Sequence, residues 1–223
     1  MKFQHIAPLL ILAAAGGACA DDSYYGALRI NSARYKAHDM DSSARPGLGR
    51  FVPGDDSHTA TGASLALGYR LPSNWRVEAE YTLPKNNEFT SGSTNFPTSF
   101  NHHKIRSQRL MVNAYKDFPL NARFSLYGTA GLGLAHLQSS GWQGNPGRQY
   151  FGDSQNNLAY AVGFGVTYSP ARKVSIDLGW RYVDMGKTQS GANNFANVRR
   201  LQDEQMRAKL TSSEISVGLR YSF

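Results

Sequence analysis

Cysteine is almost missing from this 223-residue chain, and its single cysteine, Cys19, lies close to the N-terminus. The residues around it are typical of a secretory signal peptide: a basic Lys2, an apolar run, and small residues ending in an A-x-A cleavage site. We therefore predict a cleaved signal peptide over residues 1–20 and a mature chain over residues 21–223. Such a mature chain has neither a disulfide nor a thiol site. Lipoprotein processing at Cys19 is the rival interpretation, but the preceding Gly16-Gly17-Ala18 lacks the branched apolar residue of a lipobox.

Long hydrophobic runs are also missing. The apolar stretch of the leader, Ile6–Ala15, is shorter than the about 20 residues that a membrane-spanning helix requires, and no later stretch is longer. If the mature chain crosses a membrane, it must do so with strands. Acidic residues are fewer than basic ones, which gives a net charge of +8. Because no basic helix or aromatic platform motif is present, we expect no nucleic-acid partner, and anionic lipopolysaccharide is the simpler counterpart.

Alternation with a period of two is the strongest signal present. In the closing stretch, Lys209–Phe223, apolar Ile215, Val217 and Leu219 alternate with small, polar or charged residues. Only an extended strand places such residues on opposite faces. Seven upstream segments show the same pattern: Tyr24–Ala33, Thr61–Leu71, Trp75–Thr82, Ile105–Lys116, Arg123–Leu137, Leu158–Tyr168 and Val174–Val183.

The connections between these eight segments are of two kinds. Three are short and turn-like, whereas four are long and rich in Gly, Ser, Asn, Asp and Pro: 36–59, 84–104, 138–157 and 184–208. Short turns on one side, long loops on the other and an even strand count match outer-membrane barrels. We therefore predict an all-β fold: an eight-stranded antiparallel transmembrane up-and-down β-barrel, with four long extracellular loops and both termini periplasmic. A soluble β-sandwich would leave the long loops unexplained.

The faces predicted to point inward carry charges. They include Arg29, Arg109, Glu78, Glu80, Asp177, Arg181, Glu214 and Arg220. Because an eight-stranded barrel is just filled by side chains and unpaired buried charges are costly, we predict an interior ion-pair network. Counting from the last hairpin places Arg181 and Glu214 at about the same height, and Asp177 diagonal to Arg220. Arg29, on the strand that closes the barrel, is the alternative partner of Glu214. A catalytic role for Glu78 and Glu80 as an acid–base pair is the alternative.

The predicted loops offer few chemical motifs. His102 and His103 are adjacent and should point apart, so we interpret them as exposed polar surface rather than as a metal site; we expect no cofactor. Residues 198–210 are predicted to form a short amphipathic turn of helix near the membrane surface. Its basic residues are candidates for contact with lipopolysaccharide phosphates, although a solvated mixed-charge loop is an equal alternative: Arg199, Arg200, Arg207 and Lys209.

Four C-terminal segments resemble a known family. They read LYGTAGLGLAHL (126–137), LAYAVGFGVTY (158–168), DLGWRYVDMGK (177–187) and SSEISVGLRYSF (212–223). These segments look like the opacity (Opa) proteins and, more broadly, like the barrel domain of outer-membrane protein A. The resemblance implies a barrel whose loops contact host receptors, and a terminal aromatic signal, Tyr221 and Phe223, that is read by the barrel-assembly machinery.

The function predicted from these observations is that of a non-enzymatic surface protein of the outer membrane. Its barrel would display loops for adhesion to a host receptor or for lipopolysaccharide contact, and would support envelope integrity as a monomer. A lipid A-modifying enzyme is the first alternative, but its closest candidates, His136 with Ser139 or Ser140, lack a matched acid. A narrow porin is the second alternative.

Overall fold

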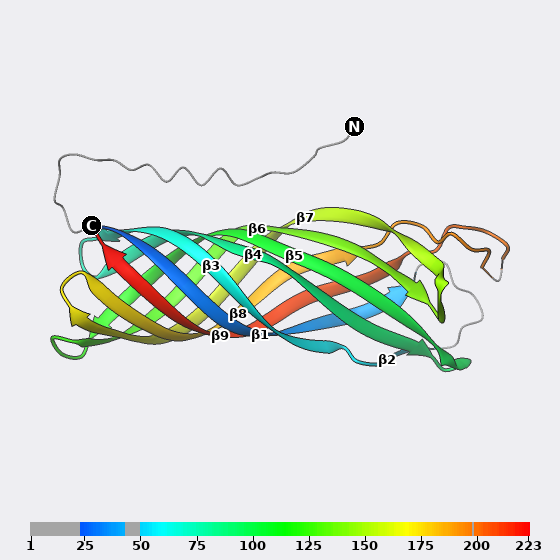
Figure 1. The fold of residues 1–223 in the computed structure, drawn as a ribbon, viewed down its shortest axis with the longest axis horizontal. Coiled ribbons are helices and arrows are strands. Elements are labelled where there is room, and N and C mark those ends of the chain that lie inside the picture. The colour runs from blue at the N-terminus through cyan, green and yellow to red at the C-terminus, as the bar shows by residue number, and fades with distance from the viewer. Residues whose placement is uncertain (1–22, 43–49, 198) are drawn as a thin grey trace, which may run out of the picture.

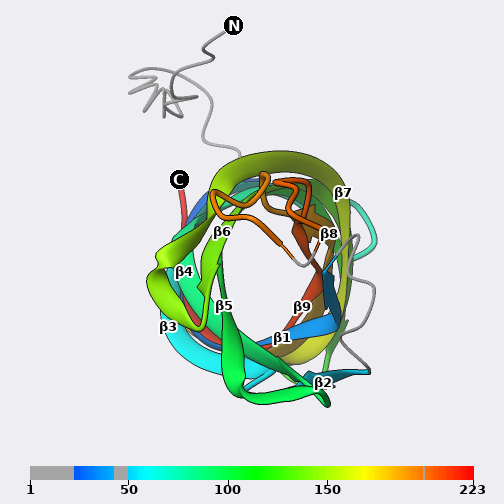
Figure 2. The same cartoon turned by 90° about the vertical axis from the view of Figure 1, so that its right-hand side faces the viewer.

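The computed structural model describes residues 23–42, 50–197 and 199–223. The predicted signal peptide, residues 1–20, lies outside the described residues. Eight long strands form the barrel: β1 (Tyr24–Ser42), β3 (Ser57–Leu71), β4 (Trp75–Ser93), β5 (Phe96–Pro119), β6 (Phe124–Gln143), β7 (Asn145–Ala171), β8 (Val174–Gln189) and β9 (Met206–Ser222). Each pairs antiparallel with its neighbour, and β1 pairs with β9 to close the ring (Figure 2). A short β2 (Phe51–Pro53) pairs with β4. The predicted eight-stranded up-and-down barrel is therefore confirmed.

The two ends of the barrel differ (Figure 1). At one end, here called the short-turn end, tight turns join β3 to β4 at 72–74, β5 to β6 at 120–123 and β7 to β8 at 172–173. The start of β1 and the residue that follows β9 also meet at this end, where the backbone N–H of Phe223 donates to the carbonyl oxygen of Tyr24 at 3.2 Å. The opposite end, here called the hairpin end, carries the remaining connections.

Two of the four predicted long loops are wrong. Strands β4 and β5 continue toward each other and are joined by Thr94 and Asn95, while β6 and β7 are joined by Gly144 alone. Gly144 has a φ of +69°, in the left-handed region that glycine occupies without a steric penalty. Segments 84–104 and 138–157 are thus mostly paired strand. The barrel wall therefore continues well past the outward-facing apolar residues described next.

The direction of the apolar residues reverses along the barrel. In the half nearer the short-turn end, large apolar side chains point outward, and Leu132, Leu158 and Ile215 are 60%, 70% and 59% exposed. In the half nearer the hairpin end, apolar side chains point inward, and Leu137, Met185 and Leu210 are fully buried. We call the outward apolar band the belt. Above it, charged residues such as Lys104 and Arg106 face outward, as expected where water replaces lipid.

One seam of the wall is incomplete. The β3–β4 ladder ends at the pair Ser64 and Thr82, although both strands continue toward the hairpin end. Pro84 follows shortly after Thr82, and a proline has no N–H to donate to a ladder. Contact resumes where Thr90 exchanges backbone hydrogen bonds with Gly54 and Asp55. No helix long and apolar enough to cross a membrane occurs among the described residues.

Candidate functional site

A chain of alternating charges crosses the barrel interior at the height of the belt. Arg181 donates to Glu80 at 2.8 Å and to Glu214 at 2.9 Å, and Arg109 lies 2.6 Å from Glu214. Arg29 lies 2.6 Å from one oxygen of Glu78 and 3.6 Å from Glu80. The order of contacts is Glu78–Arg29–Glu80–Arg181–Glu214–Arg109. Because every charge touches an opposite one, the desolvation cost of burial is offset, and a structural role explains Glu78 and Glu80.

The predicted pair of Arg181 and Glu214 is present, and the second arginine on Glu214 is not Arg29, the alternative partner considered for it. Arg181 and Glu214 lie directly opposite each other on β8 and β9. Arg29, however, contacts Glu78 and Glu80, whereas the second arginine on Glu214 is Arg109. Arg109 projects from β5 on a distant part of the ring. Counting along hairpins compares neighbouring strands only, so it misses a contact made across the lumen.

Nearer the short-turn end the predicted diagonal pair is present, with Arg220 donating to Asp177 at 3.3 Å. A second pair at this end was not predicted: Arg76 donates through Nε and Nη2 to the two oxygens of Asp117, at 2.7 and 2.9 Å. Asp117 lies one residue past the predicted strand Ile105–Lys116, whereas β5 extends through Pro119. An acidic residue following the apolar run of β5 was the signal available.

Above the charge chain, apolar side chains pack in the interior beside uncharged polar ones such as Ser107, Ser139 and Thr188. A cluster of buried side chains fills this section, including Tyr35, Phe89, Ile105, Leu137, Met185 and Leu210. Phe89, Ile105, Leu137, Met185 and Leu210 are each 0% exposed. Tightly packed apolar side chains leave no room for a file of hydrated ions. This arrangement disfavours the narrow-porin alternative.

The connection between β8 and β9 folds over the hairpin end. Asn193 forms a backbone bridge with Tyr150, and its side-chain oxygen accepts the N–H of Glu204 at 2.7 Å. Asn193 and Glu204 are both buried, so this connection is held against β7. The predicted helical turn over 198–210 is wrong: 199–205 is non-helical, Met206–Leu210 belong to β9, and Val198 lies outside the described residues.

The two neighbouring histidines have different environments. His102 lies outward, stacked on Trp142 with ring centroids 4.5 Å apart, and 2.9 Å from Glu88. His103 is 2% exposed and shares a 2.6 Å hydrogen bond with Ser139, so the prediction of exposed surface is wrong for this residue. Burial lowers the pKa of His103 to about 4, because desolvation penalises its charged form. The described ranges contain no group of three or more metal-ligating side chains.

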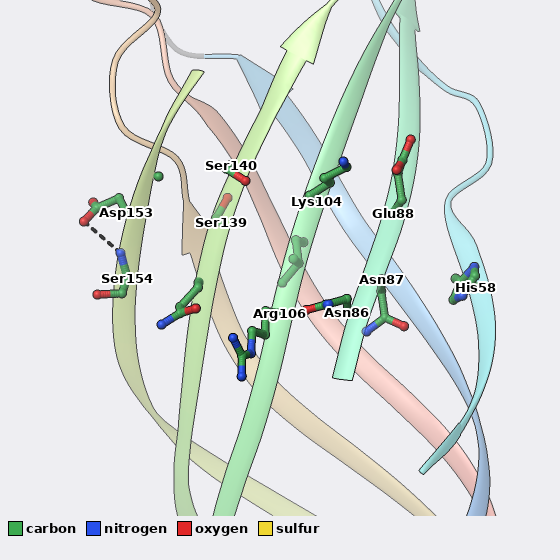
Figure 3. A pocket seen from close by; sticks show the side chains of 13 residues that line it. His58, Asn86, Asn87, Glu88, Lys104, Arg106, Ser139, Ser140, Asp153 and Ser154 are labelled. Carbon is green, nitrogen blue, oxygen red and sulfur yellow. Dashed lines mark hydrogen bonds between the residues drawn. The ribbon is translucent and has the colours of Figure 1, made fainter. Parts of the chain in front are cut away.

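A polar groove lies on the outer wall above the belt, across β4 to β7 with His58 of β3 at its edge (Figure 3). Its volume is about 760 Å³. Amide, hydroxyl and charged groups dominate its lining: Asn86, Glu88, Lys104, Arg106, Gln138, Ser140, Asp153 and Ser154. Carbohydrates and polar peptides are the ligands that such groups recognise by hydrogen bonds.

One feature of the groove leaves binding capacity open. Arg106 is exposed and makes no ion pair or side-chain hydrogen bond with another described residue. Its guanidinium donors are therefore available to a ligand. Asn87, by contrast, lies between the exposed Asn86 and Glu88 on the buried face of β4, so its amide is not presented to the groove.

The candidate nucleophiles do not form a catalytic arrangement. His136 hydrogen-bonds Asn156 at 2.7 Å and Gln138 at 3.3 Å. Ser139 is buried against His103, facing the interior, whereas Ser140 lines the outer groove. No contact joins His136 to either serine within the part of the chain that the structure describes, and the serine–histidine pair that is present, Ser139 with His103, is buried in the interior away from the outer groove.

The four basic residues proposed for lipopolysaccharide fall into two groups. Arg207 and Lys209 lie on β9, where Lys209 is 2.7 Å from Asp184. Arg199 and Arg200 lie in the connection over the hairpin end, and Arg199 is paired with Asp203 at 2.6 Å. The aromatic residues predicted as the assembly signal, Tyr221 and Phe223, are 53% and 55% exposed at the short-turn end.

A closed eight-stranded ring with an outward apolar belt and a charged interior defines the class of outer-membrane β-barrel proteins. The chain belongs to the outer membrane protein beta-barrel domain family, whose model matches residues 6–223. It is an outer-membrane protein.

Two relatives illustrate the family. Outer membrane protein PagN of Salmonella typhimurium is 27% identical over 176 residues, covering 73% of this chain and 72% of PagN. A Rickettsia bellii protein that bears the name "Putative adhesin" is 25% identical over 216 residues, covering 91% of this chain and 89% of that protein.

Solved structures share the fold. Neisserial surface protein A (NspA) matches with a TM-score of 0.51 at 20% identity, covering 90% of this chain and 97% of that chain. OprG from Pseudomonas aeruginosa matches with a TM-score of 0.53 at 16% identity, again covering 90% and 97%. The protease OmpT from Escherichia coli matches with a TM-score of 0.55 at 11% identity, covering 94% and 99%. At these identities the likeness concerns the fold alone.

Proposed function

We propose that this protein is a non-enzymatic adhesin of the outer membrane, with its hairpin end outside the cell and its short-turn end in the periplasm. The observation that carries this proposal is the wall above the belt: strands β4 to β7 continue past the lipid-facing residues as two long hairpins. The interior behind them is packed, so the outer face of this wall is the surface available for contact. Relatives named as adhesins support this assignment.

The groove of Figure 3 is the proposed contact surface. It is polar, it contains the unpartnered Arg106, and Lys104 beside it lies over the ring of Trp142 at 4.6 Å. Neither Lys104 nor Arg106 has a carboxylate partner among the described residues, and two such cations favour an acidic group on the bound host molecule.

The test is adhesion of a non-adherent Gram-negative host that expresses the protein. We expect wild-type cells to bind cultured epithelial cells, and K104E/R106E to lose most of that binding at equal surface levels. The matched control is R50E/R200E, which makes the same charge change at two exposed residues of the hairpin end that line neither the groove nor the face of β1, β8 and β9 considered below. Absence of adhesion by the wild type would refute the proposal, whereas equal loss in both double variants would refute the groove as the contact surface.

The topology has its own test. An epitope inserted between Thr94 and Asn95 should be labelled by antibody on intact cells, because these residues are the tip of the β4–β5 hairpin. An epitope inserted at Ser73, in the turn of the short-turn end, should be labelled only after permeabilisation. Reversed labelling would invert the proposed orientation.

Lipopolysaccharide contact is proposed for the outward face of β1, β8 and β9 rather than for the four residues first considered. Arg207 and Lys209 share this face with Arg34, Lys36 and Lys187, just above the belt. Lysine and arginine at this height can bind phosphates of the outer leaflet. We also propose that Tyr221 and Phe223 are read by the barrel-assembly machinery.

The absence of enzymatic activity is part of the proposal. The OmpT likeness concerns architecture, and the serine–histidine pair that is present, Ser139 with His103, is buried in the barrel interior. We expect the mass spectrum of lipid A to be unchanged when the protein is expressed, and a new or lost acyl chain would contradict this part of the proposal.

A further inference from the structure

A second pocket, of about 360 Å³, lies inside the rim at the short-turn end, opposite the proposed adhesion surface. Four arginines line it, from three strands and one turn: Arg70, Arg76, Arg123 and Arg220. Asp117 is the carboxylate that lines the pocket, and both of its oxygens are bound by Arg76. The pocket therefore has more positive than negative charge.

The unsatisfied donors of this pocket belong to Arg220. It is 4% exposed and donates a single hydrogen bond, from Nη2 to Asp177 at 3.3 Å. Its Nε and Nη1 are buried, and neither has a hydrogen-bond partner among the described residues. Asp177 is shared, because it also accepts the hydroxyl of Thr167 at 2.6 Å. Leaving charged donors buried without acceptors is costly, so an acceptor placed in the pocket would be bound favourably.

Tyr25 holds two of the arginines in place. The guanidinium carbons of Arg70 and Arg220 lie 5.7 and 5.2 Å from the centroid of its ring, within the range of cation–π contact. Tyr25 is fully buried, and its hydroxyl donates to Glu78 at 2.9 Å. Because both guanidinium groups contact this one fixed ring, they are held in the same part of the pocket despite their like charge.

Hydroxyl groups complete the lining. Ser169 and Ser175 lie 3.0 Å apart and line the pocket together with Thr167. A cluster of fork-shaped guanidinium groups with nearby hydroxyls is the donor set that matches the tetrahedral oxygens of a phosphate. The volume admits a phosphate with a small organic group attached.

We propose that the short-turn end binds a phosphate group, held by Arg70 and Arg220 with Arg123 at the rim. The phosphate comes either from a phospholipid headgroup of the adjacent leaflet or from a soluble phosphate ester. This site would anchor the barrel at its short-turn end, and it does not depend on the adhesion proposed for the other end.

Trp75 provides the readout, because it lines the same pocket. Purified protein in a phosphate-free, uncharged detergent is titrated with inorganic phosphate while tryptophan fluorescence is followed, and binding is checked by calorimetry. We expect saturable binding that is weakened at least ten-fold in R70Q. The matched control is R172Q, which removes an exposed arginine from another turn of the same end and should bind as the wild type does.

R220K provides a second variant, since it keeps the charge and removes the fork. We expect weakened phosphate binding with an unchanged gel shift of the folded barrel, which separates binding from folding. To distinguish the sources, glycerol 3-phosphate is compared with phosphatidylglycerol in mixed micelles: tighter binding of the lipid assigns a headgroup, and equal binding assigns a soluble ester. No saturable response to any phosphate, or an equal response in wild type and R70Q, would overturn the proposal.

Discussion

Replacing Glu214 by glutamine should destabilise the barrel strongly. Its carboxylate accepts from Arg109 at 2.6 and 3.1 Å, from Arg181 at 2.9 and 3.2 Å, and from Ser212 at 2.7 Å, and the residue is 1% exposed. Arg181 would keep Glu80, but Arg109 would lose the carboxylate that it contacts. Removing one partner of a buried pair typically costs about 3–5 kcal/mol. We expect a loss of that size in the free energy of unfolding of E214Q.

The double variant R109M/E214Q identifies the cause. Because it removes the stranded charge as well, its loss should fall short of the sum of the two single losses by more than ~0.5 kcal/mol, the scatter seen for independent sites. Urea unfolding of refolded protein in lipid vesicles measures all three variants. D203N, which breaks the exposed pair with Arg199, is the control and should have little effect, since surface pairs are worth about 0–1 kcal/mol. Additive losses would refute the assignment of Arg109 as the partner.

Three further predictions concern the closed ring, its last residue and a buried histidine. Unboiled protein should migrate faster than boiled protein on a denaturing gel, because a closed ring has no free edge at which unfolding can start; identical migration would contradict the ring. Deleting Phe223 should reduce the amount of folded protein in the outer membrane, whereas normal levels would remove its role as a signal. Because the folded pKa of His103, about 4, lies below its ordinary value of 6.5, unfolded chains bind more protons between these values. Stability should therefore fall as the pH drops from about 6.5 to about 4, and H103Q should lose this part of the pH dependence in urea unfolding at several pH values.

The belt could be predicted from the sequence because lipid imposes a simple rule there. Residues such as Leu132, Val162 and Val217 must face hydrocarbon, so every second position is apolar. Above the belt the rule is lost. Lys104 and Arg106 face water, while their inward neighbours alternate between polar His103 and apolar Ile105. Strand pairing continues there through backbone hydrogen bonds, which leave no trace in the pattern of side chains, so the hairpins were taken for loops.

The site was harder to predict than the fold. Pairs on neighbouring strands, such as Arg181 and Glu214, follow from register, since residues opposite each other in a hairpin are fixed by its turn. The contact of Arg109 with Glu214 depends on how far two side chains reach across the lumen. The groove is formed by residues of four strands, beside the interrupted ladder at Pro84. The alternation of residues along a single strand predicts neither feature.

The reversal of apolar direction separates two kinds of sequence change. Within the belt, a polar substitution at an outward position is costly because the side chain faces lipid. Above the belt, the outward positions of β4 to β7 face water, whereas the apolar residues that pack these strands together point inward. Asn86, Arg106, Gln138 and Ser154 can therefore be exchanged with little effect on folding. For the adhesin proposed above, the contact surface could therefore change its chemistry while the fold is kept.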